Sequence, residues 1–445
     1  MSKPYKFITF GCWNDWNSTS PAVSSVLSSV SDYCKKNNDC KFMIVTGDNY
    51  YPKKIKDKQD KTNVKKYKII NVDHLKKGLN ALPENIPIYL LLGNHDLDNS
   101  LTHISSNPNI TLNEVSDLDK PEECTILKEE KVIVTINNER NNNNIHLPDK
   151  LTMHFINEDS KTLFLMIDTT VYDIYNLIYL KQNKITEKDE KKIKDAIVCY
   201  EYLDFELKDI EKILEAQKKE ILKRISTIDP NNIKNIVISG HHPLAEVKVD
   251  DHNNFKKSYL FASYDLLLEI YKIFNNSVNY YYLCADYHCY QYGEIALTFN
   301  DTNSSKMIIN QYIVGTGGAK LDEAIPSVDK IKIDESIIKH PLYVDTYNDL
   351  KYTIFYKIND TIKINGFLVC TSDKNDVLSF EFHIVSNKTS EPFDYQSEPF
   401  DYQSEPIDYQ IGGKNKSKTR KLHKKKGKSS KKNRNKNKTH KSNRK

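Results

Sequence analysis

Five short apolar segments of the sequence end in turns whose side chains can bind a metal ion. The five turns read GCWND (Gly11–Asp15), GDNYY (Gly47–Tyr51), GNHD (Gly93–Asp96), GHHP (Gly240–Pro243) and ADYH (Ala285–His288). A glycine allows a tight backbone turn. Carboxylate, imidazole, amide, phenol and thiol groups are ligands for hard or borderline metals. One such turn means little, but five in succession predict a metal site.

The elements that must position these turns read as alternating strands and helices. The predicted strands are Tyr5–Phe10, Lys41–Thr46, Ile88–Leu92, Thr162–Ile167, Asn235–Ser239 and Tyr280–Cys284. Their nearly continuous apolar character is typical of strands buried on both faces. Helical spacing is seen over Ala22–Lys35, Val72–Leu82 and Glu187–Ile225. The alternation predicts an α/β fold with a largely parallel central sheet, whose site lies beyond the carboxyl ends of the strands.

The remaining segments suggest a domain, a linker and a tail. Residues 1–386 form the predicted domain, with a polar insertion at 97–150 that holds one predicted strand, Lys131–Ile136, and with further strands over 361–386. Residues 387–410 contain three copies of a heptapeptide, SEPFDYQ, SEPFDYQ and SEPIDYQ. Because each copy contains a proline, we expect an extended acidic linker there. Residues 411–445 form a predicted disordered polybasic tail.

The formal net charge of +5 averages two opposite regions. Residues 411–445 hold 17 of the 65 Lys and Arg residues and none of the 60 Asp and Glu residues, so residues 1–410 carry a net charge of −12. Such a tail can bind phosphate backbones without sequence preference. Non-specific nucleic-acid binding through 411–445 is one expectation. A solvated tail that docks on the acidic body or acts as a localisation signal is the other.

The cysteines and the N-terminus suggest an intracellular protein. The eight cysteines form no C-x-x-C pair, no apolar h-region follows Met1, and no apolar segment approaches the roughly 20 residues of a membrane span. We therefore expect reduced thiols, no membrane partner and no secretion, with the protein in the cytoplasm, the nucleus or a virion. The composition resembles that of proteins of large DNA viruses.

The turns, taken in order, resemble those of the calcineurin-like metallophosphoesterases, and the GDNYY form resembles purple acid phosphatases. The resemblance runs from about Tyr5 to Val385 and includes the FLMIDTT strand, the GTGGAK turn (Gly315–Lys320) and the GFLVC strand. It implies a four-layer sandwich in which two packed β-sheets are flanked by helices. It also implies two divalent or trivalent metal ions, iron together with zinc, manganese or a second iron.

The resemblance assigns roles to individual residues. Asp48 would bridge both metals, Tyr51 and His288 would bind the first metal, and Asn94 and His241 would bind the second. His95 would contact the phosphate and protonate the leaving group. General acid catalysis of this kind raises a reaction rate roughly 10²–10⁴-fold. Asn94 also belongs to the expected substrate site, and His242 is expected to face the substrate more than a metal.

Two positions depart from the family pattern. Cys12 stands where the family has aspartate, and Asp286 stands where it has histidine, so one ligand of each metal is exchanged. Thiolate binds zinc and iron well, and a carboxylate is a competent ligand. Cys12 could equally be a small buried hydrophobe, and a shift of the first loop could bring Asp15 to the metal instead.

The predicted function is metal-dependent hydrolysis of phosphate monoesters, on a phosphorylated small molecule or protein. Two metal ions can clamp a phosphate and activate a water near neutral pH. The alternatives are a catalytically impaired pseudo-phosphatase that acts as a binding or packaging protein, and a phosphodiesterase or nuclease on the same fold.

Overall fold

The computed structural model describes most of residues 4–385 and nothing beyond them. The described ranges are 4–15, 22–56, 66–103, 123–148, 152–180, 186–202, 210–249, 255–299, 306–325, 342–347 and 350–385. All of them belong to one compact unit, Met1–Thr389. The predicted linker and polybasic tail lie outside the described residues.

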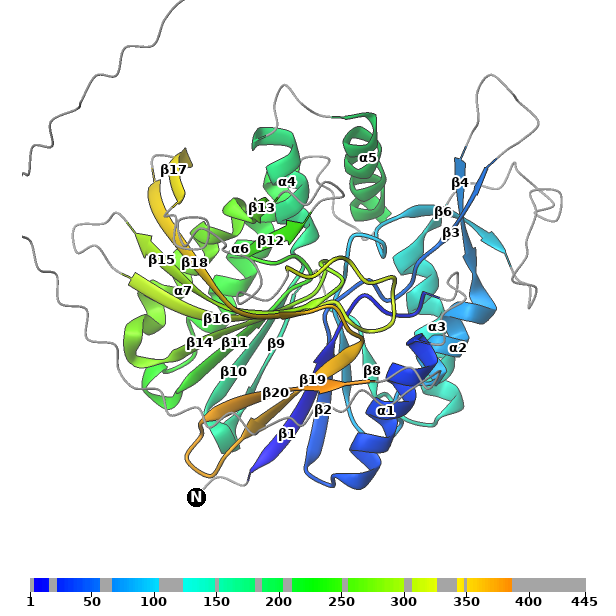
Figure 1. Cartoon of the computed structure of the whole chain (residues 1–445), viewed down its shortest axis with the longest axis horizontal. Helices are drawn as coiled ribbons and strands as arrows, with labels where there is room; N and C mark the ends of the chain where they lie inside the picture. The colour runs from blue at the N-terminus through cyan, green and yellow to red at the C-terminus, as the bar shows by residue number, and fades with distance from the viewer. Residues whose placement is uncertain are drawn as a thin grey trace, which may run out of the picture. The chain divides into compact units, whose positions relative to one another are not determined.

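Two mixed β-sheets form the body of this unit (Figure 1). The first sheet has the order β20 (Leu378–Ile384), β19 (Gly366–Ser372), β1 (Tyr5–Phe10), β2 (Cys40–Val45), β5 (Ile88–Leu90), β8 (Ile145–His146). The second has the order β17 (Leu342–Tyr347), β18 (Leu350–Ile362), β15 (Tyr290–Phe299), β16 (Lys306–Val314), β14 (Asn279–Cys284), β11 (Asn235–Ser239), β10 (Thr162–Ile167), β9 (Thr152–Asn157).

Each sheet contains a block of four parallel strands. In the first sheet β1, β2, β5 and β8 are parallel, and in the second β10, β11, β14 and β16 are parallel. Antiparallel strands complete both sheets, and the orange strands β19 and β20 lie beside the blue β1 in Figure 1, which joins the two ends of the unit in one sheet. The largely parallel arrangement predicted for a single central sheet therefore applies to one part of each of two sheets.

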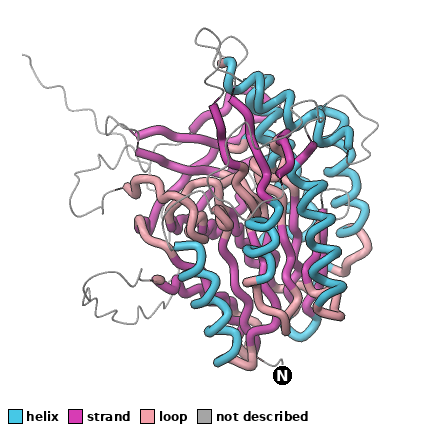
Figure 2. The backbone as a smooth tube through the Cα atoms, turned by 90° about the vertical axis from the view of Figure 1, so that its right-hand side faces the viewer, coloured by secondary structure: helices cyan, strands magenta, loops and turns pink. Residues whose placement is uncertain are grey.

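Helices cover the outer faces of the two sheets, and Figure 2 shows them flanking the strands. The apolar sides of α1 (Ala22–Lys36), α2 (Val72–Asn80) and α3 (Thr125–Glu139) belong to the same core cluster as the first sheet. Those of α4 (Thr170–Leu180), α5 (Glu187–Tyr202), α6 (Ile210–Ile225) and α7 (Tyr264–Phe274) pack with the second sheet. The predicted four-layer sandwich is confirmed.

The two sheets pack face to face through aromatic side chains. Phe7 on β1 meets Phe164 on β10 edge-on, with ring centroids 5.3 Å apart, and Phe42 on β2 meets Phe155 on β9 at 5.2 Å. Alternate residues of these strands point to this shared core, and the residues between them point to the covering helices. Both faces of the strands are therefore apolar. Edge-to-face rings also restrict how the sheets can slide past each other.

Two small sheets lie outside the main layers. One pairs β12 (Ala245–Val249) with β13 (Phe255–Tyr259), and the other has the order β3 (Lys53–Lys56), β4 (Lys66–Asn71), β6 (Asn99–His103), β7 (Glu123–Cys124). None of the helices in the described part of the chain is both long and apolar enough to cross a bilayer.

Two predicted elements are wrong in type or extent. Lys131–Ile136, predicted as a strand because it is β-branched, lies inside α3, where the buried residues Ile126, Glu129, Ile133 and Ile136 follow a helical spacing. Val134, between them, is 54% exposed. The helix predicted over Glu187–Ile225 is instead two helices, α5 and α6, and the residues between them lie outside the described part.

The expectation of reduced thiols is also wrong for one pair. Cys124, where β7 meets α3, forms a disulfide with Cys199 on α5. The Sγ atoms of Cys34 and Cys40 are 2.6 Å apart across the turn between α1 and β2. The sequence could not reveal the first pair because its members are 75 residues apart.

Candidate metal centre

The five predicted turns converge because parallel strands in both sheets end on the same side. The first and second turns are held together by a hydrogen bond from Cys12 N to Gly47 O, 3.1 Å. The fourth and fifth are held by Ala285 N to His241 O, 2.8 Å. The GTGGAK turn supports the first loop through Ala319 N to Cys12 O, 3.1 Å. Backbone hydrogen bonds thus join the first turn to the second and the fourth turn to the fifth.

The carboxylate of Asp48 lies at the centre of the site, and its two oxygens face different partners. Oδ2 accepts a hydrogen bond from the Tyr51 hydroxyl, 2.9 Å. Oδ1 is 3.4 Å from His241 Nε2 and accepts a hydrogen bond from His95 N, 3.0 Å. Gly93 allows this approach, because a Cβ on it would lie 2.3 Å from Oδ1.

Two histidines present an unprotonated Nε2 to the site. His241 Nδ1 is 2.8 Å from the Thr46 carbonyl, and His288 Nδ1 is 2.8 Å from the Lys320 carbonyl. A carbonyl can only accept, so each Nδ1 carries the proton and each Nε2 keeps its lone pair, as metal-binding histidines do. His241 Nε2 is buried without a hydrogen-bond partner, and His288 Nε2 is 3.2 Å from the Tyr51 hydroxyl.

Cys12 lies inside this cluster. Its side chain is fully buried, and its Sγ lies within 4.8 Å of ligand atoms of Asp48 and His241. Asp15 is part of no such group among the described residues, so the loop presents Cys12 and not Asp15. Burial, and next to it the negative charge of Asp48, raises the pKa of the Cys12 thiol well above its usual value.

Asp286 is the second exchanged position, and it is held by a lysine that the sequence did not point to. Its Oδ1 is 3.8 Å from His241 Nε2, and its Oδ2 is 3.3 Å from Nζ of Lys248 on β12. Lys248 also pairs with Glu246 at 3.0 Å. Burial alone would raise the pKa of Asp286, but Lys248 and the neighbouring histidines hold it well below its usual range.

The remaining predicted residues border this centre. His95 is one quarter exposed, its Nδ1 is 2.8 Å from Asp98 Oδ2, and its ring contacts that of Tyr51 at 4.7 Å between centroids. Asn94 lies half-buried in the same turn. His242 is buried, with Nδ1 3.3 Å from Thr169 Oγ1 and Nε2 3.7 Å from Asp173 Oδ2.

Four residues around these predicted positions were missed: Asp98, Thr169, Asp173 and Lys248. Thr169 follows a predicted strand, in the FLMIDTT segment, so the strand-end argument could have found it. Asp173 lies on α4, where Lys192 of α5 holds it at 2.8 Å. Lys248 lies in a strand pair outside the main sheets, and no motif marks it.

Three residues of the cluster adopt left-handed backbone conformations. The φ angles are 52° at Cys12, 52° at Asp48 and 56° at Asp286. Such angles are uncommon outside glycine and gather at functional sites.

The donor atoms around His241 Nε2 have the spacing of a metal site. A tetrahedral ion with bonds of about 2.1 Å holds its ligand atoms about 3.4 Å apart. The 3.4 Å and 3.8 Å separations of Asp48 Oδ1 and Asp286 Oδ1 from His241 Nε2 match that spacing. Burial alone would raise the pKa of Asp48, but positive charge on the protonated rings of His241 and His95, together with the hydrogen bond from His95 N, lowers it.

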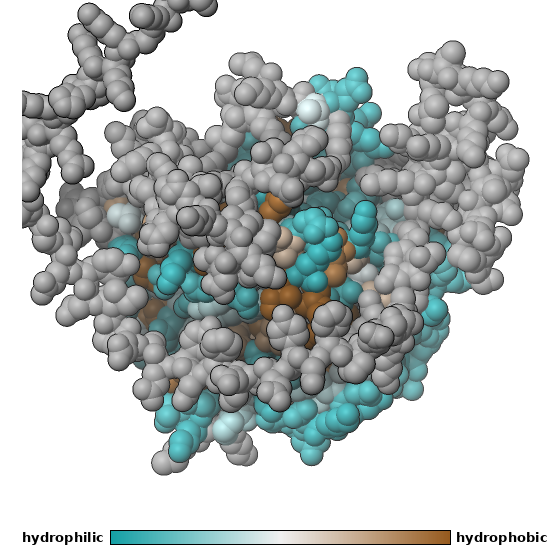
Figure 3. Space-filling view, in the orientation of Figure 1, coloured by the Kyte–Doolittle hydropathy of each residue, from teal (hydrophilic) through white to brown (hydrophobic). Residues whose placement is uncertain are grey.

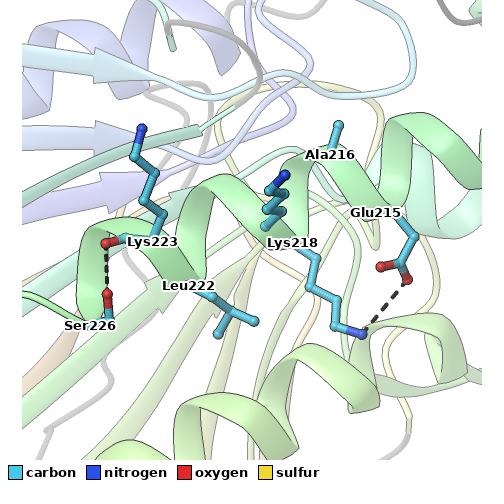
Figure 4. Close-up of a pocket in the computed structure, with 7 residues that line it drawn as sticks. Glu215, Ala216, Lys218, Leu222, Lys223 and Ser226 are labelled. Carbon is cyan, nitrogen blue, oxygen red and sulfur yellow. Dashed lines mark hydrogen bonds and ion pairs between the residues drawn. The ribbon is translucent and has the colours of Figure 1, made fainter.

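A second concave feature lies away from this chemistry. A depression of about 630 Å³ follows one side of α6 and is lined by Glu215, Ala216, Lys218, Lys219, Leu222, Lys223 and Ser226 (Figure 4). It contains none of the predicted site residues.

On the face shown in Figure 3, hydrophilic residues line the lower rim and an apolar patch lies near the centre.

Comparisons with known proteins agree with this geometry. The family model of the calcineurin-like phosphoesterases matches residues 8–290. No curated protein sequence matches the chain.

Two solved structures are similar to the chain, each at 13% identity and a TM-score of 0.40. GAP50, the anchor in the inner membrane complex of Plasmodium, is covered over 90% of its chain and covers 87% of this one. The purple acid phosphatase PPD1 from yellow lupin seeds is covered over 53% of its chain and covers 88% of this one. At this level of similarity neither bears on what this chain binds. On the family match, the chain belongs to the calcineurin-like phosphoesterase family.

Proposed function

We propose that this chain hydrolyses phosphate monoesters at a dinuclear metal site. The observation that supports this proposal is that the two oxygens of the Asp48 carboxylate face different residues. Oδ2 faces Tyr51, which in turn contacts His288, while Oδ1 faces His241, which in turn faces Asp286. A carboxylate placed between two separate donor sets is what a bridging ligand requires.

The two donor sets would hold different metals. Cys12, Tyr51 and His288 would complete one site, and Asn94, His241 and Asp286 the other. Sulfur and phenolate donors favour iron or zinc, and the oxygen-rich second set also suits manganese. When bound, the pair would supply Lewis-acid stabilisation of the phosphate and an activated water.

The protein's own residues would position the ester and handle its protons. His95 is fixed by Asp98 and belongs to neither predicted metal set, so it can give a proton to the leaving oxygen. Asn94 would orient the phosphate beside it. Because His95 is one quarter exposed, it can exchange its proton with solvent between turnovers.

The test is metal content followed by a substrate screen. Protein purified without chelator should hold close to two metal ions by elemental mass spectrometry, and it should hydrolyse aryl and alkyl phosphate monoesters faster than bis-esters. Metal uptake near zero after incubation with zinc, iron or manganese would refute the proposal. Faster cleavage of bis-esters or of nucleic acid would favour the diesterase alternative.

One observation favours a second candidate, a pseudo-phosphatase that binds without turnover. Asp286, the substitute ligand, is already engaged by Lys248, an internal cation. If that pair prevails over a metal, the second site stays empty and the domain acts as a binding or packaging module. One metal per chain with no ester hydrolysis would support this reading.

The partners that we propose follow the same logic. The substrate would be a phosphorylated small molecule or protein, met inside the cell. The polybasic segment 411–445 would add salt-sensitive, non-specific binding to nucleic acid. Electrophoretic mobility shifts at two salt concentrations, with and without this segment, test that part separately.

A further inference from the structure

His242 differs from the two histidines that face the metals in what its Nδ1 contacts. His241 and His288 each direct Nδ1 at a backbone carbonyl. His242 directs Nδ1 at the Thr169 hydroxyl, 3.3 Å away. A carbonyl fixes the proton on Nδ1, whereas a hydroxyl can either donate or accept. The other contacts of Thr169 therefore decide the tautomer of His242.

Thr169 has no lone pair left for His242. Its Oγ1 accepts hydrogen bonds from two backbone amides, His241 N at 2.9 Å and His242 N at 2.8 Å. A hydroxyl oxygen has two acceptor positions and one proton to donate. The proton can go to His242 Nδ1 or to the hydroxyl of Tyr282, which also bonds Thr169. In neither case can Thr169 accept a proton held on Nδ1. Thr169 must therefore be the donor in its hydrogen bond to Nδ1, and with that bond made, neutral His242 carries its proton on Nε2.

That Nε2–H group is buried and has no hydrogen-bond partner among the described residues. Only 5% of His242 is exposed. The nearest carboxylate oxygen, Asp173 Oδ2, is 3.7 Å away and already accepts from Lys192 at 2.8 Å. Buried donors are rarely left unpaired, and an orphan donor at the border of a site calls for an acceptor that arrives from outside.

The position of His242 identifies that acceptor. A ring nitrogen of His242 and ligand atoms of His241 and Asp286 lie within 4.8 Å of one another, so the ring of His242 borders the second proposed metal position. We propose that His242 Nε2–H donates a hydrogen bond to a phosphate oxygen of the substrate, and that Thr169 is the positioning residue that fixes this tautomer. The inference rests on the proposed function and adds a substrate contact to it.

Two amide variants separate the two ring nitrogens. An asparagine amide lies where Nδ1 lies, and a glutamine amide reaches the place of Nε2, so His242→Gln keeps the donor and His242→Asn does not. With inorganic phosphate as the probe and calorimetry on metal-loaded protein, we expect His242→Asn to weaken binding about 10- to 100-fold, the range for a hydrogen bond to a charged group. His242→Gln should stay within about threefold of the wild type.

Metal content and the tautomer complete the test. Both variants should keep the wild-type number of metals. The ¹⁵N spectrum of histidine-labelled, metal-free protein should show the His242 proton on Nε2, and Thr169→Ser should preserve it. Loss of one metal from both variants would make His242 a ligand and overturn the inference, as would equal phosphate affinity in both or a proton on Nδ1. A wild type without metals would refute the proposed function alone, because the tautomer is read on metal-free protein.

Discussion

The loops after β1 and β14 carry the two exchanged ligands, and they accommodate the exchange in opposite ways. Cys12 is fully buried among Tyr51, Ala285 and Ala319. The side chain of Asp286 is 26% exposed and pairs with Lys248, which also pairs with Glu246. One loop exchanges an anion for a thiol in a dry environment. The other adds an anion and supplies a cation beside it.

Neighbouring residues compensate the change in charge at Asp286 but not the change at Cys12. A histidine replaced by aspartate adds one negative charge to the second donor set, and Lys248 cancels it. A cysteine replaces the charge of aspartate only as thiolate, and burial raises the pKa of Cys12 well above its usual value. In the proposed dinuclear site, Cys12 would therefore need a bound metal to ionise, whereas Asp286 is ionised in advance by Lys248.

Removal of Asp48, the carboxylate that would bridge the two proposed metal positions, should have the largest effect. Asp48→Asn is expected to release both metals and to lower kcat/KM by about 10³-fold or more, because metal stabilisation of a phosphate is worth several kcal/mol. Elemental analysis and ester hydrolysis measure this. Asp159→Asn, at an exposed position, is the control and should keep both. Two metals retained in Asp48→Asn would contradict the bridging role.

Removal of the thiol tests the loop after β1 alone. Cys12→Ala should lower affinity for one of the two metals by at least about 10-fold, since losing even an outer partner of a ligand costs that much. The control is Cys370→Ala on β19, also buried and free. Competition with a chromogenic chelator gives the affinities. Unchanged affinity in Cys12→Ala would leave this cysteine as a buried hydrophobe.

The loop after β14 should respond to charge more than to ligand type. Asp286→His, which restores the family residue, is expected to weaken the second metal about 10-fold, because Lys248 then keeps only Glu246 as an anionic partner and repels the metal beside it. Adding Lys248→Met should recover most of that loss. Chelator competition on the single and double variants measures the coupling. A gain in affinity in Asp286→His alone would show that the site is degraded and not adapted.

The last prediction concerns stability and the support beneath the second turn. Asp96 accepts hydrogen bonds from Asn49 N and Gly93 N, and the buried Glu129 of α3 interacts with it. Burial raises the pKa of Glu129 to about 7, above its usual 4.5. A carboxyl group whose pKa is raised on folding stabilises the fold at pH values below its pKa in the unfolded chain. This stabilisation is lost as the pH rises through 7.

The metal-free wild type should therefore lose roughly 2–3 kcal/mol of stability between pH 5 and pH 8 that Glu129→Gln does not lose. Urea unfolding at the two pH values measures both proteins. Parallel pH profiles would show that Glu129 does not titrate in this range.

The sequence predicted the elements whose pattern is local. β1, β10 and β11 begin and end where their apolar runs do, and the glycine turns after the strands give the residues that gather around Asp48. The segment Lys131–Ile136 was misassigned because β-branched residues also fit a helix when every third or fourth one is buried.

The sequence could not predict contacts made across the fold. Lys248, Asp173 and the disulfide between Cys124 and Cys199 are defined by residues distant in the chain, and no spacing marks them. The role of Thr169 depends on counting the hydrogen bonds of one hydroxyl. Such compensation leaves no local signature because only the tertiary structure brings the partners together.

The left-handed angles at Cys12, Asp48 and Asp286 mean that this protein is less stable than its fold allows. Each non-glycine residue in that conformation costs on the order of 1–2 kcal/mol. A glycine at position 12 would adopt the same φ without strain, and this relief offsets part of the cost of removing a fully buried side chain in Cys12→Gly. The loops that gather the ligands are thus a place where selection for binding opposes selection for durability.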